Sequence, residues 1–248
     1  MAWDRLDYQS DRLEGYAAAL EQLRETGRLY PCTCSRREIA EAAGETGGPR
    51  IYPGTCRNKT IIPHGRHALR VDTRNAVVRF VDRIQGGQTF RLHEESGDYV
   101  LRRADGLYSY QLAVAIDDAE QGMTEVVRGN DLIESTARQM YLHRLLGLAS
   151  PIYAHLPVAV DPGTGRKLSK QTFARPLEDS RAARNVWDVL AFLGQAPPAD
   201  LRRSDLPTVL QWGLDHWRLD AIPARAGIAV EPGHLGDLPA CGPTGHKQ

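Results

Sequence analysis

The sequence contains 248 residues, enough for one large domain or for a catalytic domain that carries a smaller insertion. Basic and acidic residues balance at 31 each, which argues against a protein that binds nucleic acid by non-specific phosphate attraction but allows a local basic face. The longest apolar runs, such as 112–116, are far shorter than the roughly 20 residues of a membrane helix. The N-terminus also lacks the apolar core of a secretory signal. We therefore expect a cytoplasmic protein with no membrane partner.

The N-terminal part of the chain is predicted to be helical. Apolar residues recur at helical spacing within residues 8–30, and Gly27 is a natural end for that helix. A second, shorter helix is predicted for residues 36–43. The stretch 44–56 is rich in glycine, proline and threonine and is predicted to be a loop.

The pattern then changes to short β-branched segments, which predict a small antiparallel β region between Ala68 and Arg103. The expected strands are 68–71, 76–81, 89–92 and 99–103. The expected turns are Gly86-Gly87 and Asp105-Gly106.

From Ser109 the segments alternate between helix and strand. The expected order is helix 109–120, strand 124–127, helix 131–148 and strand 152–155. This alternation predicts a parallel α/β sheet. Two further helices are expected at 182–193 and 206–217, and the segment after Ile228 is predicted to be loose.

Three of the four cysteines form a sequence cluster, Cys32-x-Cys34 followed by Cys56. A chain of this size without a secretory signal belongs in a reducing compartment, so a metal site explains the cluster better than disulfides do. Three thiolates can bind zinc, although ordinary buried thiols would give the same spacing. Cys241 stands alone and is predicted to be a free thiol.

A tetrahedral zinc site needs a fourth ligand. His64 and His67 could supply it on chemical grounds. Tyr52 also lies close, but tyrosine is an uncommon zinc ligand and could equally be a packing aromatic. In each case the expected role is structural, because a small β subdomain gains much of its stability from a bound metal.

Residues that could form a substrate pocket follow the β region. Tyr110 opens a predicted helix, and Arg128 ends a predicted strand, where ligands bind in open α/β sheets. A guanidinium suits a carboxylate because its fork gives two charge-assisted hydrogen bonds. Arg128 could instead form a local ion pair with Asp131. The loop that carries Lys167 and Lys170 could neutralise phosphate charge or could be an ordinary solvated loop.

In their order and spacing these motifs resemble the class I glutamyl-tRNA synthetase lineage, and within it the glutamyl-queuosine tRNA(Asp) synthetase family. The resemblance covers residues 3–228, and residues 167–171 (KLSKQ) match the lysine-rich "KMSKS" signature of that lineage. It implies that Tyr110 and Arg128 contact glutamate, and that Lys170, with Lys167 as its neighbour, contacts the phosphates of ATP. It also implies a zinc ion held by Cys32, Cys34, Tyr52 and Cys56, which favours Tyr52 over His64.

The implied fold is a Rossmann-like parallel sheet of the class I synthetases with a zinc-bearing α+β insertion and a helical C-terminal segment. The expected boundaries are 1–31 for a remnant helix of the first Rossmann half, 32–104 for the insertion, 105–175 for the second Rossmann half and 176–248 for the C-terminal segment. The implied activity is ATP- and Mg-dependent activation of glutamate and its transfer to queuosine in tRNA(Asp), by a monomer.

The sequence departs from this family in one respect. Class I synthetases begin with a strand, a "HIGH"-type histidine motif and a helix that hold ATP, and residues 1–31 contain no such motif. We therefore expect the first Rossmann half to be missing and the 248-residue chain alone to activate glutamate poorly or not at all. Alternatives are a shortened glutamyl-tRNA synthetase that acts on the tRNA acceptor end and a non-catalytic zinc- and RNA-binding remnant.

Overall fold

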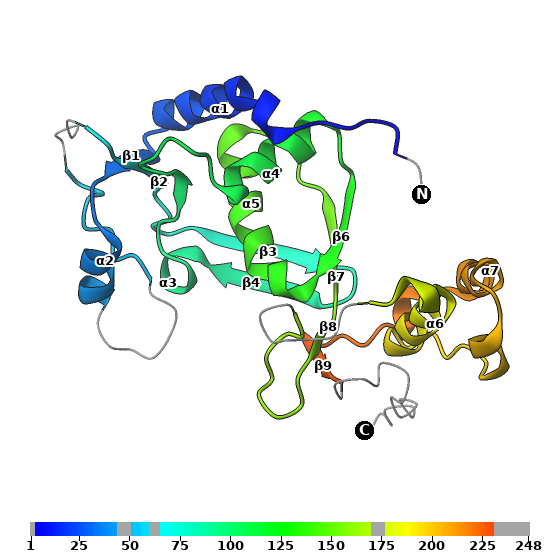
Figure 1. Ribbon diagram of the computed structural model, residues 1–248. Helices are drawn as coiled ribbons and strands as arrows, with labels where there is room; N and C mark the ends of the chain where they lie inside the picture. The colour runs from blue at the N-terminus through cyan, green and yellow to red at the C-terminus, as the bar shows by residue number, and fades with distance from the viewer. Residues whose placement is uncertain (1–2, 44–50, 60–64, 170–176, 231–248) are drawn as a thin grey trace. The chain divides into compact units, whose positions relative to one another are not determined.

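The computed structural model describes residues 3–43, 51–59, 65–169 and 177–230. They divide into two compact units. Figure 1 labels the helices and strands of the chain. Unit 1 comprises Met1–Phe80, Gly87–Val126 and Ile133–Ile152. Unit 2 comprises Val81–Gly86, Val127–Leu132 and Tyr153–Gln248. No described helix is both long enough and apolar enough to cross a membrane.

Within the described part of unit 1, the α-helices are α1 (Leu13–Glu25), α2 (Arg36–Ala43), α3 (Leu92–Glu95), α4 (Tyr110–Glu120) and α5 (Ile133–Leu146), and the short 3₁₀ helix η1 (Gln9–Asp11) precedes α1. The apolar faces of α1, α4 and α5 share one core with the neighbouring strands. Its fully buried members include Leu23, Val71, Leu112 and Leu142. The predicted helices near 36–43, 109–120 and 131–148 are thereby confirmed.

A three-stranded antiparallel sheet in unit 1 consists of β1 (Leu29–Cys32), β2 (Ala68–Val71) and β5 (Val100–Arg102), in the order β1-β2-β5. The sequence did not predict β1. Gly27 has a φ of +67°, which ends α1 and lets the chain turn into the strand. The pairing of β1 with β2 brings the start of the cysteine cluster onto a sheet, because Cys32 lies opposite Ala68.

The strands β3 (Val77–Asp82) and β4 (Gly86–Arg91) form a two-stranded sheet, joined by a turn at residues 83–85. The prediction of a turn at Gly86-Gly87 was wrong, because these glycines begin β4. The turn forms three residues earlier because the Asp82 carboxylate accepts the backbone N–H groups of Ile84 and Gln85, at 2.9 and 2.8 Å.

The predicted alternation of strand and helix is confirmed in β6 (Glu125–Gly129), the short 3₁₀ helix η2 (Asn130–Leu132), α5 and β7 (Ile152–Leu156). The strands β6 and β7 pair, and the N–H of Ile152 donates to the carbonyl of Thr124 at 2.9 Å. Their starting ends are therefore adjacent, so the strands run parallel.

A second parallel pair in unit 2, β8 (Val158–Val160) with β9 (Gly227–Ala229), was not predicted. The segment after Ile228 was expected to be loose, and for residues 229 and 230 this expectation was wrong. Ala229 pairs with Val160, and Val230 is buried. Residues 231–248, which include Cys241, lie outside the described residues.

The predicted C-terminal helices of unit 2 are confirmed as α6 (Ala182–Phe192) and α7 (Leu206–His216). The 3₁₀ helices η4 (Asp179–Arg181), η5 (Asp200–Arg203) and η6 (Leu219–Ala221) accompany them. Buried residues from α6, α7 and η5 form a core of their own: Trp187, Leu190, Leu201 and Val209.

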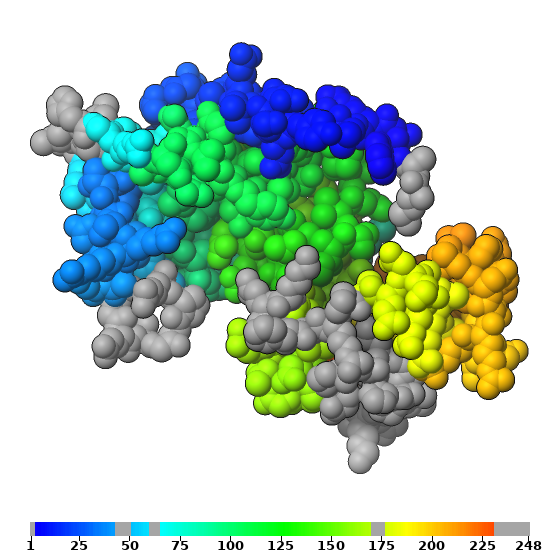
Figure 2. Space-filling model, viewed as in Figure 1, coloured from blue at the N-terminus to red at the C-terminus, as the bar shows by residue number. Residues whose placement is uncertain are grey.

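The segment before α1 is attached to α4 through one carboxylate. Asp117 accepts hydrogen bonds from Gln9 at 3.0 Å, from Arg12 at 2.6 Å and from the hydroxyl of Tyr16 at 2.9 Å. In Figure 2 the N-terminal segment and α1, in dark blue, accordingly lie along the green part of unit 1. These contacts give Asp117 a structural role within unit 1.

A second buried carboxylate, Asp98, connects several strands and loops of unit 1. It accepts hydrogen bonds from the backbone N–H and the hydroxyl of Thr73, both at 2.8 Å, and from the hydroxyl of Tyr30. The guanidinium of Arg57 also lies 2.6 Å from it. Burial and the neighbouring carboxylate raise the pKa of Tyr30 far above its ordinary value, so this hydroxyl remains a donor.

We expect the substitution Asp98→Ala to lower the free energy of unfolding by about 3–5 kcal/mol, because it removes the closer of the two carboxylates that pair with Arg57 and leaves the donors of Thr73 and Tyr30 without their acceptor. Urea denaturation followed by tryptophan fluorescence and circular dichroism would measure this loss. The control is Asp105→Ala, which removes an exposed partner of Arg103 and should cost less than about 1 kcal/mol. Equal losses in the two variants would contradict the structural role of Asp98.

Candidate functional site

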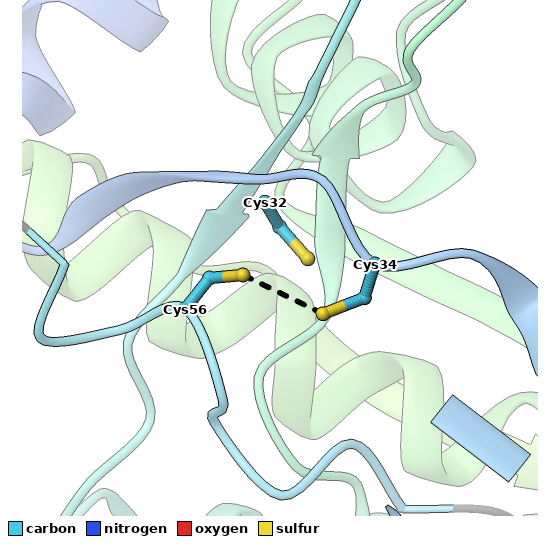
Figure 3. Close-up of side chains that lie close together, drawn as sticks. All are labelled: Cys32, Cys34 and Cys56. Carbon is cyan, nitrogen blue, oxygen red and sulfur yellow. Dashed lines mark hydrogen bonds between the residues drawn. The ribbon is translucent and has the colours of Figure 1, made fainter. Parts of the chain in front are cut away.

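The predicted cysteine cluster is assembled in unit 1 (Figure 3). Cys32 ends β1, Cys34 follows it, and Cys56 comes from the segment 51–59. The three sulfur atoms lie within 4.8 Å of one another, with Cys34 Sγ and Cys56 Sγ 3.5 Å apart. Cys32 and Cys56 are buried and Cys34 is half-buried. All three are free thiols.

The hydroxyl of Tyr52 joins this cluster. Its oxygen lies 3.3 Å from Cys32 Sγ and 3.7 Å from Cys34 Sγ, and it accepts the backbone N–H of Cys56 at 2.9 Å. The guanidinium carbon of Arg70 lies 4.0 Å from the centre of the Tyr52 ring. The ring is therefore held from its face while its oxygen points at the sulfur atoms.

The backbone at Tyr52 is held by a bridge to Gly97, which has a φ of +64°. A Cβ atom at position 97 would lie only 2.9 Å from the Tyr52 carbonyl oxygen. Only glycine combines this conformation with so close an approach. Gly97 thus lets the backbone of the segment 51–59, which carries Tyr52 and Cys56, approach closely to the backbone at position 97.

The thiols of Cys34 and Cys56 differ in pKa. Burial opposes ionisation of Cys56, but hydrogen bonds from the Thr33 backbone and the Tyr52 hydroxyl outweigh it and lower the pKa of Cys56 to about 6. Burial, together with the hydrogen bond to Cys56, raises the pKa of Cys34 to about 11. Packed thiols without a cation thus hold their protons unequally, whereas a divalent cation would favour the thiolate at every position.

The donor set fits a zinc ion. In a tetrahedral site with Zn–S bonds of about 2.3 Å, neighbouring donors lie about 3.8 Å apart, close to the separations of this cluster. Of the two histidines considered as fourth ligands, His67 is half-buried and its Nδ1 lies 3.0 Å from the Gly65 carbonyl oxygen. His64 lies outside the described residues.

Arg128 lies in unit 2, near the C-terminal end of β6. Its Nε donates to Nε2 of His155, on β7, at 3.3 Å, and its guanidinium carbon lies 5.2 Å from the centre of the Tyr153 ring. The guanidinium is therefore oriented by two residues of the adjacent parallel strand.

Behind His155 lies a fully buried carboxylate. Nδ1 of His155 and Oδ2 of Asp82 are 2.6 Å apart, and neither side chain is exposed. Burial opposes ionisation of Asp82, but the N–H of Gln85, the His155 ring and further backbone N–H groups outweigh it and hold the pKa of Asp82 below its ordinary value. Burial also lowers the pKa of His155, against the opposing effect of Asp82.

The lysine loop also reaches this end of β6. Lys167 Nζ lies 2.7 Å from Oδ2 of Asp131, which is three residues after Arg128. Gly129 makes room for this arrangement, because a Cβ at that position would lie 2.5 Å from the Asp131 carboxylate. The first lysine of the KLSKQ loop and the Arg128 strand end are thus neighbours within unit 2.

Of the other two residues of the predicted pocket, Tyr110 lies among the described residues and Lys170 does not. Tyr110 begins α4 in unit 1, where Ser109 caps the helix by accepting the N–H of Leu112, and its side chain is 48% exposed. Lys170 lies outside the described residues. The roles of Tyr110, Arg128, Lys167 and Lys170 therefore stay predictions.

Sequence reasoning missed Asp82 and His155, although a signal was present. Both are polar residues at or directly after a predicted strand, 76–81 and 152–155. Polar residues at the carboxyl ends of strands are candidates for a site in an α/β fold.

Comparison with known proteins supports the same fold and family. Residues 1–191 match the family of class I tRNA synthetases (E and Q), catalytic domain. The glutamyl-Q tRNA(Asp) synthetase of Aromatoleum aromaticum is 49% identical over 226 residues, which cover 90% of this chain and 70% of that protein. The chain belongs to the glutamyl-Q tRNA(Asp) synthetase family. The family member from Methylococcus capsulatus is 46% identical over 92% of this chain and 74% of its own length.

The family consists of ligases of the aminoacyl-tRNA synthetase class, and its α/β fold recurs in more distant solved structures. A glutamate tRNA ligase from Elizabethkingia meningosepticum, in complex with its amino acid, has a TM-score of 0.68 at 21% identity. The match covers 94% of this chain and 53% of that protein. The chain thus spans about half the length of that protein, and at this identity the match shows the fold alone.

We expect the purified protein to hold about one zinc ion per chain, and Cys56→Ser to remove it, because three thiolates and one oxygen form the donor set. The substitution Tyr52→Phe keeps the ring under Arg70 but deletes the oxygen, so zinc affinity should fall roughly 10-fold or more with the stoichiometry retained. Mass spectrometry of bound metal and a competition titration with a chelator would measure both effects.

The control for this prediction is Cys241→Ser, which should leave zinc content and affinity unchanged. Wild-type protein that takes up no zinc from a zinc-supplemented buffer would contradict the site. An unchanged affinity in Tyr52→Phe would exclude the tyrosine as a ligand.

Proposed function

We propose that this protein activates glutamate with ATP and transfers the glutamyl group to queuosine in the anticodon of tRNA(Asp). The observation that carries the proposal is the guanidinium of Arg128, oriented by buried groups at the end of a parallel strand and next to the lysine loop. Membership of the glutamyl-Q tRNA(Asp) synthetase family supports the choice of glutamate and of tRNA(Asp).

Arg128 binds a carboxylate of glutamate in this proposal, and Tyr110 provides a second contact to the amino acid. A guanidinium fork and a carboxylate match in shape, so the pair selects a carboxylate over an amide in the substrate. Tyr153 contributes by packing against the guanidinium, which limits its motion.

Lys170 and Lys167 neutralise the phosphates of ATP, which binds with Mg. Glutamate's α-carboxylate attacks the α-phosphorus, the bond to the β-phosphate oxygen breaks, and pyrophosphate leaves. A ring hydroxyl of queuosine then attacks the acyl carbon, AMP leaves, and the hydroxyl proton passes to solvent. The residues act by positioning and by charge neutralisation, because no enzyme side chain becomes acylated.

Zinc has a structural role in this proposal. Cys32, Cys34, Tyr52 and Cys56 would hold it, and it would tie the end of β1 to the segment 51–59. Such a connection stabilises a small subdomain without taking part in the reaction.

The deciding experiment incubates the protein, as its gene encodes it, with ATP, Mg and radiolabelled glutamate. Separate reactions contain tRNA(Asp) with queuosine, tRNA(Asp) without queuosine, or tRNA(Glu). Label that appears only in queuosine-containing tRNA(Asp), and in the anticodon fragment after nuclease digestion, supports the proposal. Label on the terminal adenosine of tRNA(Glu) would instead indicate a shortened glutamyl-tRNA synthetase. Absence of both labels, together with absence of glutamate-dependent ATP–pyrophosphate exchange, would favour a non-catalytic zinc- and RNA-binding protein.

We expect Arg128→Lys to raise the KM for glutamate roughly 10- to 100-fold, about 1.4–2.8 kcal/mol, because lysine keeps the charge but loses the fork. The KM for ATP should change little. The matched control is Arg225→Lys, an exposed arginine of the same unit, which should alter neither constant. Steady-state kinetics at varied glutamate would measure the effect, and an unchanged glutamate KM in Arg128→Lys would rule out the role of Arg128.

A further inference from the structure

Three side chains of unit 2 form a continuous hydrogen-bonded chain from a buried anion to the candidate substrate arginine. Asp82 contacts Nδ1 of His155 at 2.6 Å, and Nε2 of His155 accepts from Nε of Arg128 at 3.3 Å. Asp82 ends β3, His155 lies on β7 and Arg128 on β6, so the contacts join strands that are distant in sequence. We propose that His155 is a positioning residue, whose neutral Nδ1–H form, selected by Asp82, holds the guanidinium of Arg128 for the substrate carboxylate.

The protons of this chain can be assigned from chemistry. An ionised carboxylate only accepts hydrogen bonds, so Nδ1 of His155 must carry a proton toward Asp82. The Nε of arginine only donates, so Nε2 of His155 must be unprotonated. Only the neutral Nδ1–H tautomer satisfies both contacts, because the hydrogen bond at one ring nitrogen sets the proton at the other.

The Asp82 carboxylate is well placed to enforce this tautomer. Its Oδ1 accepts the backbone N–H groups of Ile84, Gln85 and His155, at 2.9, 2.8 and 3.1 Å. This leaves Oδ2 directed at the imidazole. The carboxylate and the ring are both fully buried, so neither can rotate into water to find another partner.

The charges around His155 determine how the chain responds to pH. The ionisable groups that act on the ring are Asp82, Arg128 and Asp131, and the Tyr153 ring stacks against it at 6.0 Å. Burial holds the pKa of His155 below its ordinary 6.5, so the neutral form is the native one at pH 7. Because the folded pKa is lowered, the arrangement persists above that ordinary value and is lost as the pH falls through the folded value. A second proton, on Nε2, would then face the Arg128 donor.

The consequence for the reaction rests on the proposed function. A guanidinium held through Nε has a fixed plane, and a fixed plane favours the bidentate geometry of a carboxylate pair. Loss of the acceptor at Nε2 should therefore weaken glutamate binding and leave ATP binding largely unchanged.

The sharpest test is Asp82→Asn, which is isosteric. The side-chain oxygen of the introduced asparagine can still accept the three backbone N–H groups, whereas its NH₂ group would donate to Nδ1 and move the ring proton to Nε2. We expect ¹⁵N NMR of labelled protein to show His155 as the Nδ1–H tautomer in the wild type and as the Nε2–H tautomer in Asp82→Asn. We also expect the KM for glutamate to rise at least 10-fold, with the KM for ATP within twofold.

A second pair of variants separates positioning from packing. In His155→Gln the amide oxygen can accept from Arg128 but cannot titrate. The glutamate KM of this variant should therefore stay within about threefold of the wild type, and it should not show the rise at acidic pH that protonation of His155 causes in the wild type. His155→Leu removes the acceptor and should raise the KM at least 10-fold. The matched control is His143→Gln, which alters a buried histidine of unit 1 and should leave the pH profile of the glutamate KM as in the wild type.

An Nε2–H tautomer in the wild type would overturn the inference whether or not the protein is active. So would a glutamate KM that is the same in Asp82→Asn and wild type. If the wild type glutamylates no tRNA, the proposed function fails. Solvent exchange of the Arg128 Nε–H proton then tests the hydrogen-bonded chain of Asp82, His155 and Arg128 without any need for activity. Slow exchange that accelerates in Asp82→Asn supports it, and equal exchange rates refute it.

Discussion

The buried carboxylate of Asp82 is the group on which the candidate substrate site depends. It sits where β3 ends and accepts hydrogen bonds from the turn that follows and from both the backbone and the ring of His155. One anion therefore determines where the hairpin turns, where β7 lies beside it and how the imidazole is protonated. A charge buried this deeply is stable only with such a full set of donors, so the site and the local fold cannot be separated.

A similar relation between charge and architecture holds in unit 1. Asp98 gathers donors from β1, the segment 51–59 and the turn after β2, and so brings Tyr30 and Arg57 to the same place. The cysteine cluster lies on the same two chain segments, since Cys32 follows Tyr30 and Cys56 precedes Arg57. The carboxylate network and the thiol cluster thus support one another, and Gly97 permits the close backbone approach that both require.

This chain shares its sequence with members of its family and only its fold with more distant proteins. Relatives of the glutamyl-Q tRNA(Asp) synthetase family are 44–49% identical over about nine-tenths of this chain, whereas a solved glutamate tRNA ligase has the same fold at only 21% identity. A fold can persist at the lower level because apolar patterning and strand order suffice for it. The choice of substrate requires particular side chains, and in the proposed function those are the arginine at the end of β6 and the groups that orient it.

The sequence by itself determined the helices at 36–43, 109–120 and 182–193, the grouping of three cysteines and the family, because amphipathic periods, caps and motif spacing are local properties of a chain. The pairing of β1 with β2 and of β8 with β9 came only from the tertiary structure, since strands of three or four residues have no readable period and are defined by a distant partner. The Asp82–His155–Arg128 chain was decided in the same way. Its members are separated by 46 and 27 positions, as 128 minus 82 and 155 minus 128 show, and only the pairing of strands brings such residues within hydrogen-bonding distance.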